Sequence, residues 1–401
     1  MNDPVKRTKT ISARAYGFVL LLVVLFILYG SLFPFDMRER SYPGGPLLYL
    51  LGTWREWDSP GDLLANILLY LPFGILTVNA LPRRFPGALK FLLAVIAGVV
   101  LSTAIEIAQF HDLGRVTSMG DVYANGIGTA SGAAAGILLG ASSRWPLMGE
   151  IAANPTEALL LTMFLAYRLF PYVPVIDLHK YWHAVQPMLL QPTLPPGEFL
   201  RYLVTWLFVA AVVHVLYGFR RFLLLFPLLC GGEFLGKVVI IDNALKLNDV
   251  LSAASAWLTW SVLLRRLPGK FGVLALAFAA MIAIERLQPF RFETLPRAFG
   301  WIPFASFMQG SIDVDIQAFC QKFYEYGGLV WLLNRGGMRL LVSTLFTATI
   351  LFATSFAECW LPGRSAEITD GIMALIVGGI FAVLSEKHLI HASNRVNHNT
   401  V

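Results

Sequence analysis

Ionisable and amide side chains recur at helical spacing in the first third of the chain, within segments that are otherwise apolar. Asp62 and Asn66 lie one helical turn apart, and Glu106 and Gln109 share the face of a later segment. Such groups are costly inside a membrane helix and usually face partners in the helix bundle. They favour either a buried structural cluster or a site for a polar ligand.

A second polar run follows at intervals of three, three and four residues: Arg115, Ser118, Asp121 and Asn125. Arg115 is close enough in the chain to pair with Glu106 and Asp121, which predicts an ionic cluster. This cluster either only packs the bundle, or faces a substrate, with Arg115 meeting an anionic head group. In an enzyme, Glu106 or Asp121 would be the general base and Arg115 would hold the anion.

A structural role at helix ends competes with these interpretations. Ser118-x-x-Asp121 has the spacing of a capping box, and Ser59–Pro60–Gly61–Asp62 resembles a helix start. Acids also suit the positive end of the helix dipole. Helix capping is therefore expected as the main role of four aspartates: Asp62, Asp121, Asp249 and Asp370. Capping does not account for Glu106, Gln109, Asn66 or Asn125.

The composition indicates an integral membrane protein. Of 401 residues, 56% are hydrophobic and only 14% are charged, whereas soluble domains carry about 25% charged residues. Segments long enough to cross about 30 Å of hydrocarbon recur along the whole chain. We expect an all-α transmembrane bundle of about twelve spans, at 15–33, 62–80, 89–110, 120–140, 155–172, 199–217, 221–241, 248–264, 270–289, 321–335, 338–358 and 368–386. In the fourth span, Gly126, Gly128, Gly132 and Gly136 predict close helix approach.

Charge distribution predicts the orientation. The tails and the short even-numbered loops are basic, as in Arg83–Arg84 and Arg265–Arg266, while the other loops are richer in acids. The positive-inside rule then places both termini in the cytoplasm. The three cysteines match no metal or disulfide pattern.

Recurring markers divide the chain into three four-helix units. The first span of each unit ends in a proline followed by an aromatic residue, at Phe33–Pro34–Phe35, Phe170–Pro171–Tyr172 and Gln288–Pro289–Phe290. An aspartate begins the fourth span of each unit. The predicted units are residues 1–145, 146–267 and 268–390, followed by a cytoplasmic tail at 391–401.

The first unit resembles the VanZ-like membrane family. The resemblance rests on Glu106-x-x-Gln109-x5-Arg115-x-x-Ser118-x-x-Asp121-x3-Asn125-x-x-Gly128, with Asp62-x3-Asn66 and Pro72–Phe73–Gly74 upstream. That family takes its name from an accessory protein of glycopeptide (teicoplanin) resistance. The resemblance implies a four-helix fold and an envelope location more firmly than a reaction.

The pattern weakens along the chain. In the third unit Arg364 aligns with Arg115, and Asp370 with Asp121, while Glu358 takes the Gln109 position. The middle unit keeps Asp249 but has Asn243 at the arginine position and Lys237 at the glutamine position. The binding candidates are accordingly Asp62, Asn66, Glu106, Gln109, Arg115, Ser118, Asp121, Asn125, Arg364 and Asp370.

Three functions remain open, in this order of preference. In the first, the protein recognises a lipid, a lipid-linked precursor or an amphiphilic antibiotic on the extracytoplasmic face of a bacterial inner membrane. In the second, it is an enzyme acting on a lipid head group. In the third, it is a lipid transporter or flippase. Membrane lipids or envelope precursors are the expected partners, with no nucleic acid, and the oligomeric state stays open. No cofactor is expected, and His179-x3-His183 is assigned to an amphipathic surface helix rather than to a metal site.

Overall fold

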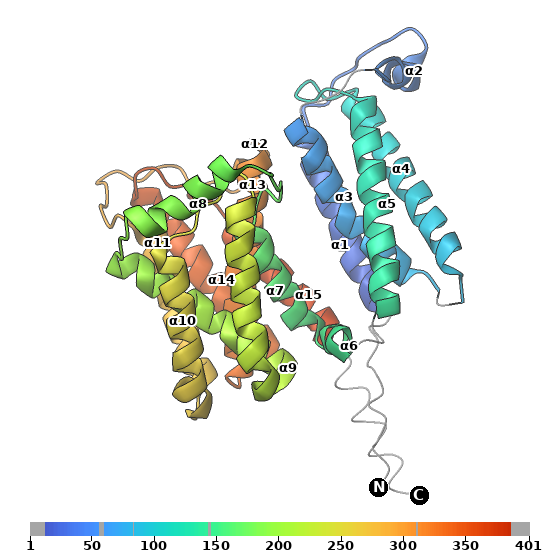
Figure 1. Ribbon diagram of the computed structural model, residues 1–401. Helices are drawn as coiled ribbons and strands as arrows, with labels where there is room; N and C mark the ends of the chain where they lie inside the picture. The colour runs from blue at the N-terminus through green and yellow to red at the C-terminus, as the bar shows by residue number, and fades with distance from the viewer. Residues whose placement is uncertain (1–12, 56–59, 83, 143–145, 310–311, 386–401) are drawn as a thin grey trace, which may run out of the picture. The chain divides into compact units, whose positions relative to one another are not determined.

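The computed structural model describes residues 13–55, 60–82, 84–142, 146–309 and 312–385. Within these ranges the chain is all-helical, and its only extended pairings are three isolated bridges. The chain divides into two compact units, one formed mainly by residues 13–153 and the other mainly by residues 154–382 (Figure 1). Ser59 and the predicted tail at 391–401 lie outside the described residues.

The first unit is a bundle of four long helices with two short ones. Its helices are α1 (Ala13–Leu32), α2 (Gly45–Gly52), α3 (Pro60–Ala80), α4 (Gly87–Gln109), α5 (Met119–Ser142) and α6 (Pro146–Ala153). In the bundle, α3 packs against both α1 and α5, and α5 also packs against α4. The core between α1, α3 and α4 is formed by Ile27, Tyr70, Phe73 and Ile105.

Close contact between α3 and α5 depends on small residues. A Cβ atom added at Gly132 would lie 2.1 Å from the carbonyl oxygen of Leu71, and one at Gly128 would lie 2.3 Å from that of Ile67. Gly74 on α3 faces the backbone of Thr129 in the same way, at 2.2 Å. These distances leave no room for a side chain, so the glycines let the two backbones touch. Gly126 is different, since its nearest neighbour would be a Val99 methyl at 3.5 Å.

The second unit contains more helices. They are α7 (Pro155–Arg168), α8 (Leu178–Leu190), α9 (Pro196–Val239), α10 (Leu247–Val262), η1 (Leu264–Arg266), α11 (Lys270–Leu287), α12 (Ala305–Gln309), α13 (Ile312–Arg335), α14 (Leu340–Ala357), η2 (Glu358–Trp360) and α15 (Thr369–Ser385). The long α9 has a non-helical residue, Gly218, at φ 74° and ψ 165°, which separates its two halves. The two spans predicted at 199–217 and 221–241 correspond to these halves.

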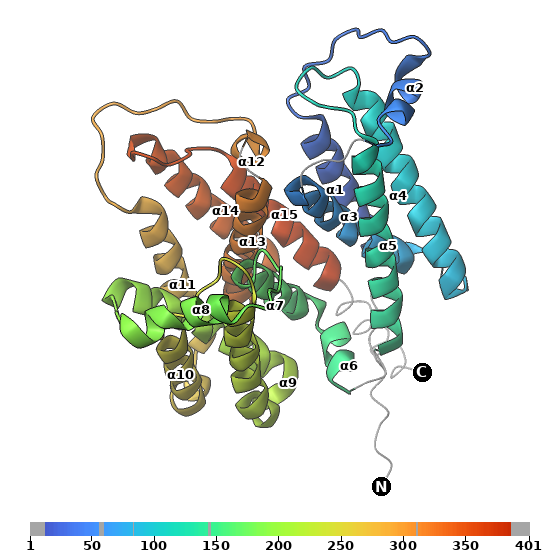
Figure 2. The same cartoon turned by 45° about the horizontal axis from the view of Figure 1, so that its top comes forward.

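Helix α8 runs across the neighbouring helices rather than along them (Figure 2). Asp177 caps its first turn by accepting a hydrogen bond from the amide of His179 at 2.9 Å. The ammonium group of Lys180 donates to the carbonyls of Lys237 and Val238 at 2.9 and 2.6 Å, at the end of α9. Desolvation lowers the pKa of Lys180 below its ordinary value. On the other side, Leu178, Trp182 and Leu189 are exposed at helical spacing, as in a helix at a membrane surface.

A helix occupies each of the twelve predicted positions, but length and composition identify fewer candidate spans. Among the described residues, five helices are long and apolar enough to cross a membrane: 61–80, 87–109, 119–140, 196–239 and 340–360. Two shorter apolar helices cover 16–32 and 369–385. The chain is thus a helical membrane protein, while the count of twelve spans in three units stays a prediction.

Three connections have the same local structure. The bonds Phe33–Pro34, Phe170–Pro171 and Gln288–Pro289 are cis, and the residue after each proline has a left-handed backbone, with φ of 66°, 64° and 59° at Phe35, Tyr172 and Phe290. The chain then pairs with the segment that precedes a later helix, at Met37 with Asp112, Pro174 with Ile240 and Gly300 with Glu367.

Candidate functional site

The polar residues of the first unit gather where α3, α4 and the start of α5 meet. Glu106 lies near the end of α4 and is only 2% exposed. Its Oε2 accepts a hydrogen bond from the amide of Ser118 at 2.9 Å, and Ser118 Oγ in turn accepts from the amide of Gly120 at 3.1 Å. Ser118 therefore caps α5, as predicted, while its own amide is held by Glu106.

Asp121 and Asn125 face neighbouring helices one turn apart on α5. The amide nitrogen of Asn66 on α3 donates to Asp121 Oδ1 at 2.5 Å, and that of Asn125 donates to Ser102 Oγ on α4 at 2.9 Å. Asp62 lies half-buried in the first turn of α3, one turn before Asn66. The spacing predicted from the sequence thus brings α3, α4 and α5 together through side-chain hydrogen bonds.

One buried oxygen atom in this cluster, Oδ1 of Asn125, has no hydrogen-bond partner among the described residues. The hydroxyl of Tyr70 is buried in the same cluster, beside Ser102, Glu106 and Asp121. Buried polar atoms are nearly always satisfied by protein or ordered water. The Asn125 oxygen therefore marks a place where water or a ligand atom would be stabilised.

Arg115 and Gln109 bind the end of α1. Arg115 donates through Nε to the carbonyl of Phe33 and through Nη2 to that of Gly30, both at 2.8 Å, and Gln109 donates to the Ser31 carbonyl at 2.8 Å. The last carbonyls of a helix lack partners within the helix, so both side chains cap α1. The expected ion pair of Arg115 with Glu106 or Asp121 is not formed in the described part of the chain. The reason is the proximity of the α1 carbonyls, which take up the guanidinium.

The second unit contains a buried ionic cluster that the sequence analysis missed. Arg168, at the end of α7, forms ion pairs with Glu233 at 2.7 Å and with Asp249. Lys237 approaches the same Asp249 at 2.8 Å. Asp249 also accepts from the backbone amide of Lys246 at 3.0 Å, which is the capping role expected for it. Burying these charges is tolerable only because each has an opposite partner.

A similar cluster surrounds Asp370. Arg286, at the end of α11, lies 2.5 Å from Asp370 and 3.1 Å from Glu358, and Lys322 lies 2.8 Å from Asp370. Arg364 is elsewhere: its guanidinium donates to the carbonyls of Glu285 and Gln288 at 2.7 and 3.0 Å. Of the two third-unit candidates, Asp370 is thus part of a buried ionic cluster and Arg364 caps α11.

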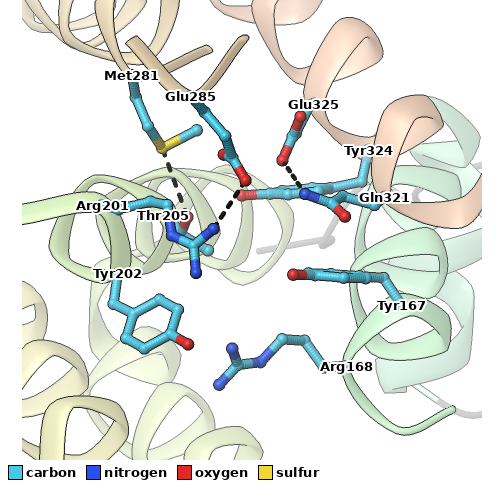
Figure 3. Close-up of a pocket in the computed structure, with 10 residues that line it drawn as sticks. All are labelled: Tyr167, Arg168, Arg201, Tyr202, Thr205, Met281, Glu285, Gln321, Tyr324 and Glu325. Carbon is cyan, nitrogen blue, oxygen red and sulfur yellow. Dashed lines mark hydrogen bonds and ion pairs between the residues drawn. The ribbon is translucent and has the colours of Figure 1, made fainter. Parts of the chain in front are cut away.

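A small polar pocket lies beside the Arg168 cluster. Figure 3 shows its lining, in which the guanidinium of Arg201 meets Glu285 at 2.7 Å and the amide of Gln321 meets Glu325 at 2.9 Å. The ring of Tyr202 lies beneath two guanidinium groups, those of Arg168 and Arg201, at 5.2 and 5.0 Å. None of these lining residues was a candidate from the sequence. Their partners come from four helices, so no local spacing marks them.

The two histidines of α8 are close to one another. His183 Nε2 lies 3.1 Å from His179 Nε2, and His183 Nδ1 lies 3.0 Å from the side-chain oxygen of Gln186. Within the described ranges, no group of three or more acidic, histidine or cysteine side chains is arranged to hold a metal ion.

Comparison with known families agrees with the geometry of the first unit. Residues 16–140, which include α1, α3, α4 and α5, match the VanZ/LLP1 family model. No curated protein and no solved structure matches the chain significantly. The chain is therefore a helical membrane protein whose first four-helix bundle, within residues 16–140, is a VanZ-like segment.

Proposed function

We propose that this protein is a binding protein of the bacterial cell envelope. Its first unit would recognise the polar head group of a lipid, a lipid-linked precursor or an amphiphilic antibiotic. One observation carries this proposal: a VanZ-like bundle that is otherwise apolar gathers Asn66, Glu106, Asp121 and Asn125, and the buried Oδ1 of Asn125 has no partner among the described residues. Polar groups at membrane depth are costly and commonly mark ligand or ion sites.

The proposed orientation places this cluster near the extracytoplasmic face of the inner membrane. With both termini in the cytoplasm, the starts of α3 and α5 and the end of α4 lie outside. Glu106, Asp121 and Asn66 all belong to these helix ends. A ligand whose apolar part stays in the bilayer would reach them with its head group alone.

The alternative functions, an enzyme or a lipid transporter, require different roles of the polar side chains. An enzyme acting on a lipid head group was expected to use Arg115 as an anion clamp, but its Nε and Nη2 donate to carbonyls of α1. This contact favours binding over catalysis. A lipid transporter would need a second accessible state of the same polar groups.

Bound lipid and lipid turnover separate these functions. Wild type, Glu106→Gln and Asp121→Asn would be purified from membranes in mild detergent, and the lipids retained would be compared by mass spectrometry. The same samples, reconstituted in vesicles, would receive radiolabelled envelope precursors. We expect the wild type to retain a specific lipid or precursor that both variants lose, without turnover or transbilayer movement.

The matched control is Glu293→Gln, which removes a carboxylate from an exposed loop of the second unit. It should retain the same lipids as wild type. Turnover that is lost in Glu106→Gln would instead establish the enzyme, and transbilayer movement would establish the transporter. Identical lipids in all four samples would rule out a role of the cluster in binding.

A further inference from the structure

Two loops of the first unit meet beside the end of α4. The loop that leaves α1 pairs with the segment after α4, since the amide of Arg38 donates to the carbonyl of His111 at 2.7 Å and that of Leu113 donates to the carbonyl of Asp36 at 3.3 Å. Figure 2 shows both loops at the end of the unit where α2 lies. These contacts place the side chains that follow Arg38 beside α2 and the end of α4.

One of these side chains, that of Arg40, rests on aromatic rings. Its guanidinium carbon lies 5.2 Å from the ring centroids of both Tyr49 on α2 and Phe110 at the end of α4. The two rings are in turn 5.1 Å apart, and Phe110 is buried. A guanidinium that lies over aromatic rings is held in place, while the N–H donors at its edge stay available.

The guanidinium of Arg40 has no hydrogen-bond acceptor or acidic partner among the described residues, whose contacts with it are those two rings. Arginines elsewhere in the chain are occupied, because Arg115 donates to carbonyls of α1 and Arg168 pairs with Asp249. The N–H donors of Arg40 are therefore left for water or a ligand. An oxyanion is the kind of ligand that such donors bind best.

A hollow of about 410 Å³ opens beside Arg40. This volume lies within the range of small-molecule sites, which is about 300–1,000 Å³. Its lining includes Glu39, Arg40, Ser41, Tyr42 and His111. The orientation predicted from the charges of the loops places this hollow on the extracytoplasmic face.

We propose that this hollow binds the oxyanion of a phosphate-bearing head group, with the guanidinium of Arg40 as its main donor. The site is separate from the polar cluster between the helices and does not depend on the function proposed for that cluster. A guanidinium presents its donors in a planar fork that matches two oxygens of a phosphate. The hydroxyl of Ser41 and the ring of His111 line the same hollow and can supply further hydrogen bonds.

Glu39 restricts which head groups fit the hollow. Its carboxylate lines the same space as Arg40. It repels a second negative charge on the ligand, whereas it tolerates a neutral group and attracts an amine. The site is therefore suited to a phosphodiester, which carries a single negative charge, rather than to a phosphate monoester.

Water-soluble head groups test the assignment. Glycerophosphoethanolamine and glycerophosphoglycerol would be added to the full-length protein in dodecyl maltoside, which contains no phosphorus, and binding would be followed by broadening of their phosphorus NMR signals. We expect both diesters to bind the wild type. Arg40→Gln should weaken both about tenfold or more, because the loss of a hydrogen bond to a charged group typically costs at least that factor.

The matched control is Arg38→Gln. It removes the same charge two residues away, but Arg38 is exposed, lies 3.4 Å from Asp36 and does not line the hollow. Binding should therefore stay at the wild-type level. Equal losses in Arg38→Gln and Arg40→Gln would show general attraction by charge instead of a site, and they would overturn the proposal.

The rings beneath Arg40 supply a second test. Tyr49→Leu removes one ring and should weaken binding about two- to fivefold although Arg40 is intact, because a cation–π contact at an exposed site is worth about that factor. Tyr49→Phe keeps the ring and should bind like the wild type. Unchanged binding in a folded Tyr49→Leu protein counts against the site. If that variant does not fold, the comparison of Arg40→Gln with Arg38→Gln decides.

Two sources of the oxyanion are distinguished by inorganic phosphate. Preference for the diesters over inorganic phosphate, relieved in Glu39→Gln, indicates a lipid head group, and equal binding indicates a free anion. The polar cluster is tested by lipid retention in Glu106→Gln and Asp121→Asn, so failure of either proposal leaves the other standing. Binding of neither the diesters nor inorganic phosphate to the wild type would overturn the oxyanion site.

Discussion

Asn243 donates its side-chain amide to the carbonyl oxygen of Phe170 at 2.6 Å, across 73 residues of the chain. Arg115 and Arg364 make the same contact with the residues before Pro34 and Pro289. A short amide therefore performs a capping task that two arginines perform elsewhere. This agreement supports the sequence register in which the three residues were aligned, and with it the proposal of a tandem four-helix repeat.

Removing one of these caps should destabilise the bundle that it closes. Arg115→Ala leaves two α1 carbonyls without their donor, and we expect a loss of about 1–3 kcal/mol for each buried group left unsatisfied. Thermal unfolding in detergent would measure it. Arg38→Ala is the control, because Arg38 is exposed and its pair with Asp36 at 3.4 Å contributes little. Equal stability of both variants would contradict the capping role.

Arg286 is expected to be the most sensitive single position of the second unit. Arg286→Ala leaves Asp370 and Glu358 with one cation fewer in a buried site, which costs about 3–5 kcal/mol when a buried pair is broken. The double variant Arg286→Met/Asp370→Asn should recover part of this loss. Arg201→Ala breaks a half-exposed pair with Glu285 and should cost less. Unfolding midpoints in a single detergent give the comparison, and additive losses in the double variant would argue against coupling of Arg286 with Asp370.

The glycines of α5 differ in what they tolerate. Gly132→Ala forces the α3 and α5 backbones apart, since the added Cβ would lie 2.1 Å from the Leu71 carbonyl, and we expect a loss of at least about 2 kcal/mol. Gly140→Ala adds a methyl where no atom lies within 4 Å and should be neutral or slightly stabilising. Unfolding of the two variants side by side tests this. A neutral Gly132→Ala would mean that the two helices do not pack so closely in the membrane.

Orientation can be tested without a ligand. A reporter fused after Arg266 should behave as cytoplasmic, because that loop is among the basic ones. A reporter fused after Tyr42 should behave as extracytoplasmic. Paired alkaline phosphatase and green fluorescent protein fusions read the two sides in opposite ways. The reverse pattern would move the polar cluster of the first unit to the inner face and refute the proposed site of recognition.

The sequence predicted the helices well because their boundaries are marked locally. Apolar length, proline and glycine indicated a helix at each of the twelve predicted positions, two of which are separated by the break at Gly218, but not the short helices α2, α6 and α12. Spacing on one helix also predicted that Asp62 and Asn66 share a face of one helix and that Asp121 and Asn125 share a face of another. These signals act within a few residues of each boundary, so a single sequence contains them.

Pairing between distant helices could not be predicted in the same way. Arg168 meets Asp249 across 81 residues, and Arg286 meets Asp370 across 84. Both arginines stand three residues before a marker proline, and this shared position was the one available signal. Arg115 was assigned to the carboxylates because of its charge, but the helix carbonyls were closer. Competition between these acceptors depends on geometry that local spacing does not contain.

The most direct test of the binding proposal is a cryo-electron microscopy structure of the full-length protein in nanodiscs of envelope lipids. We predict density for a lipid or amphiphile head group within hydrogen-bond distance of Asp121 and Asn125, with its apolar chain along the first unit. No such density is expected at Asp249 or Asp370, which are covered by their own cations. A head group bound elsewhere, with the Asp121 cluster closed and empty of ligand, would contradict the account.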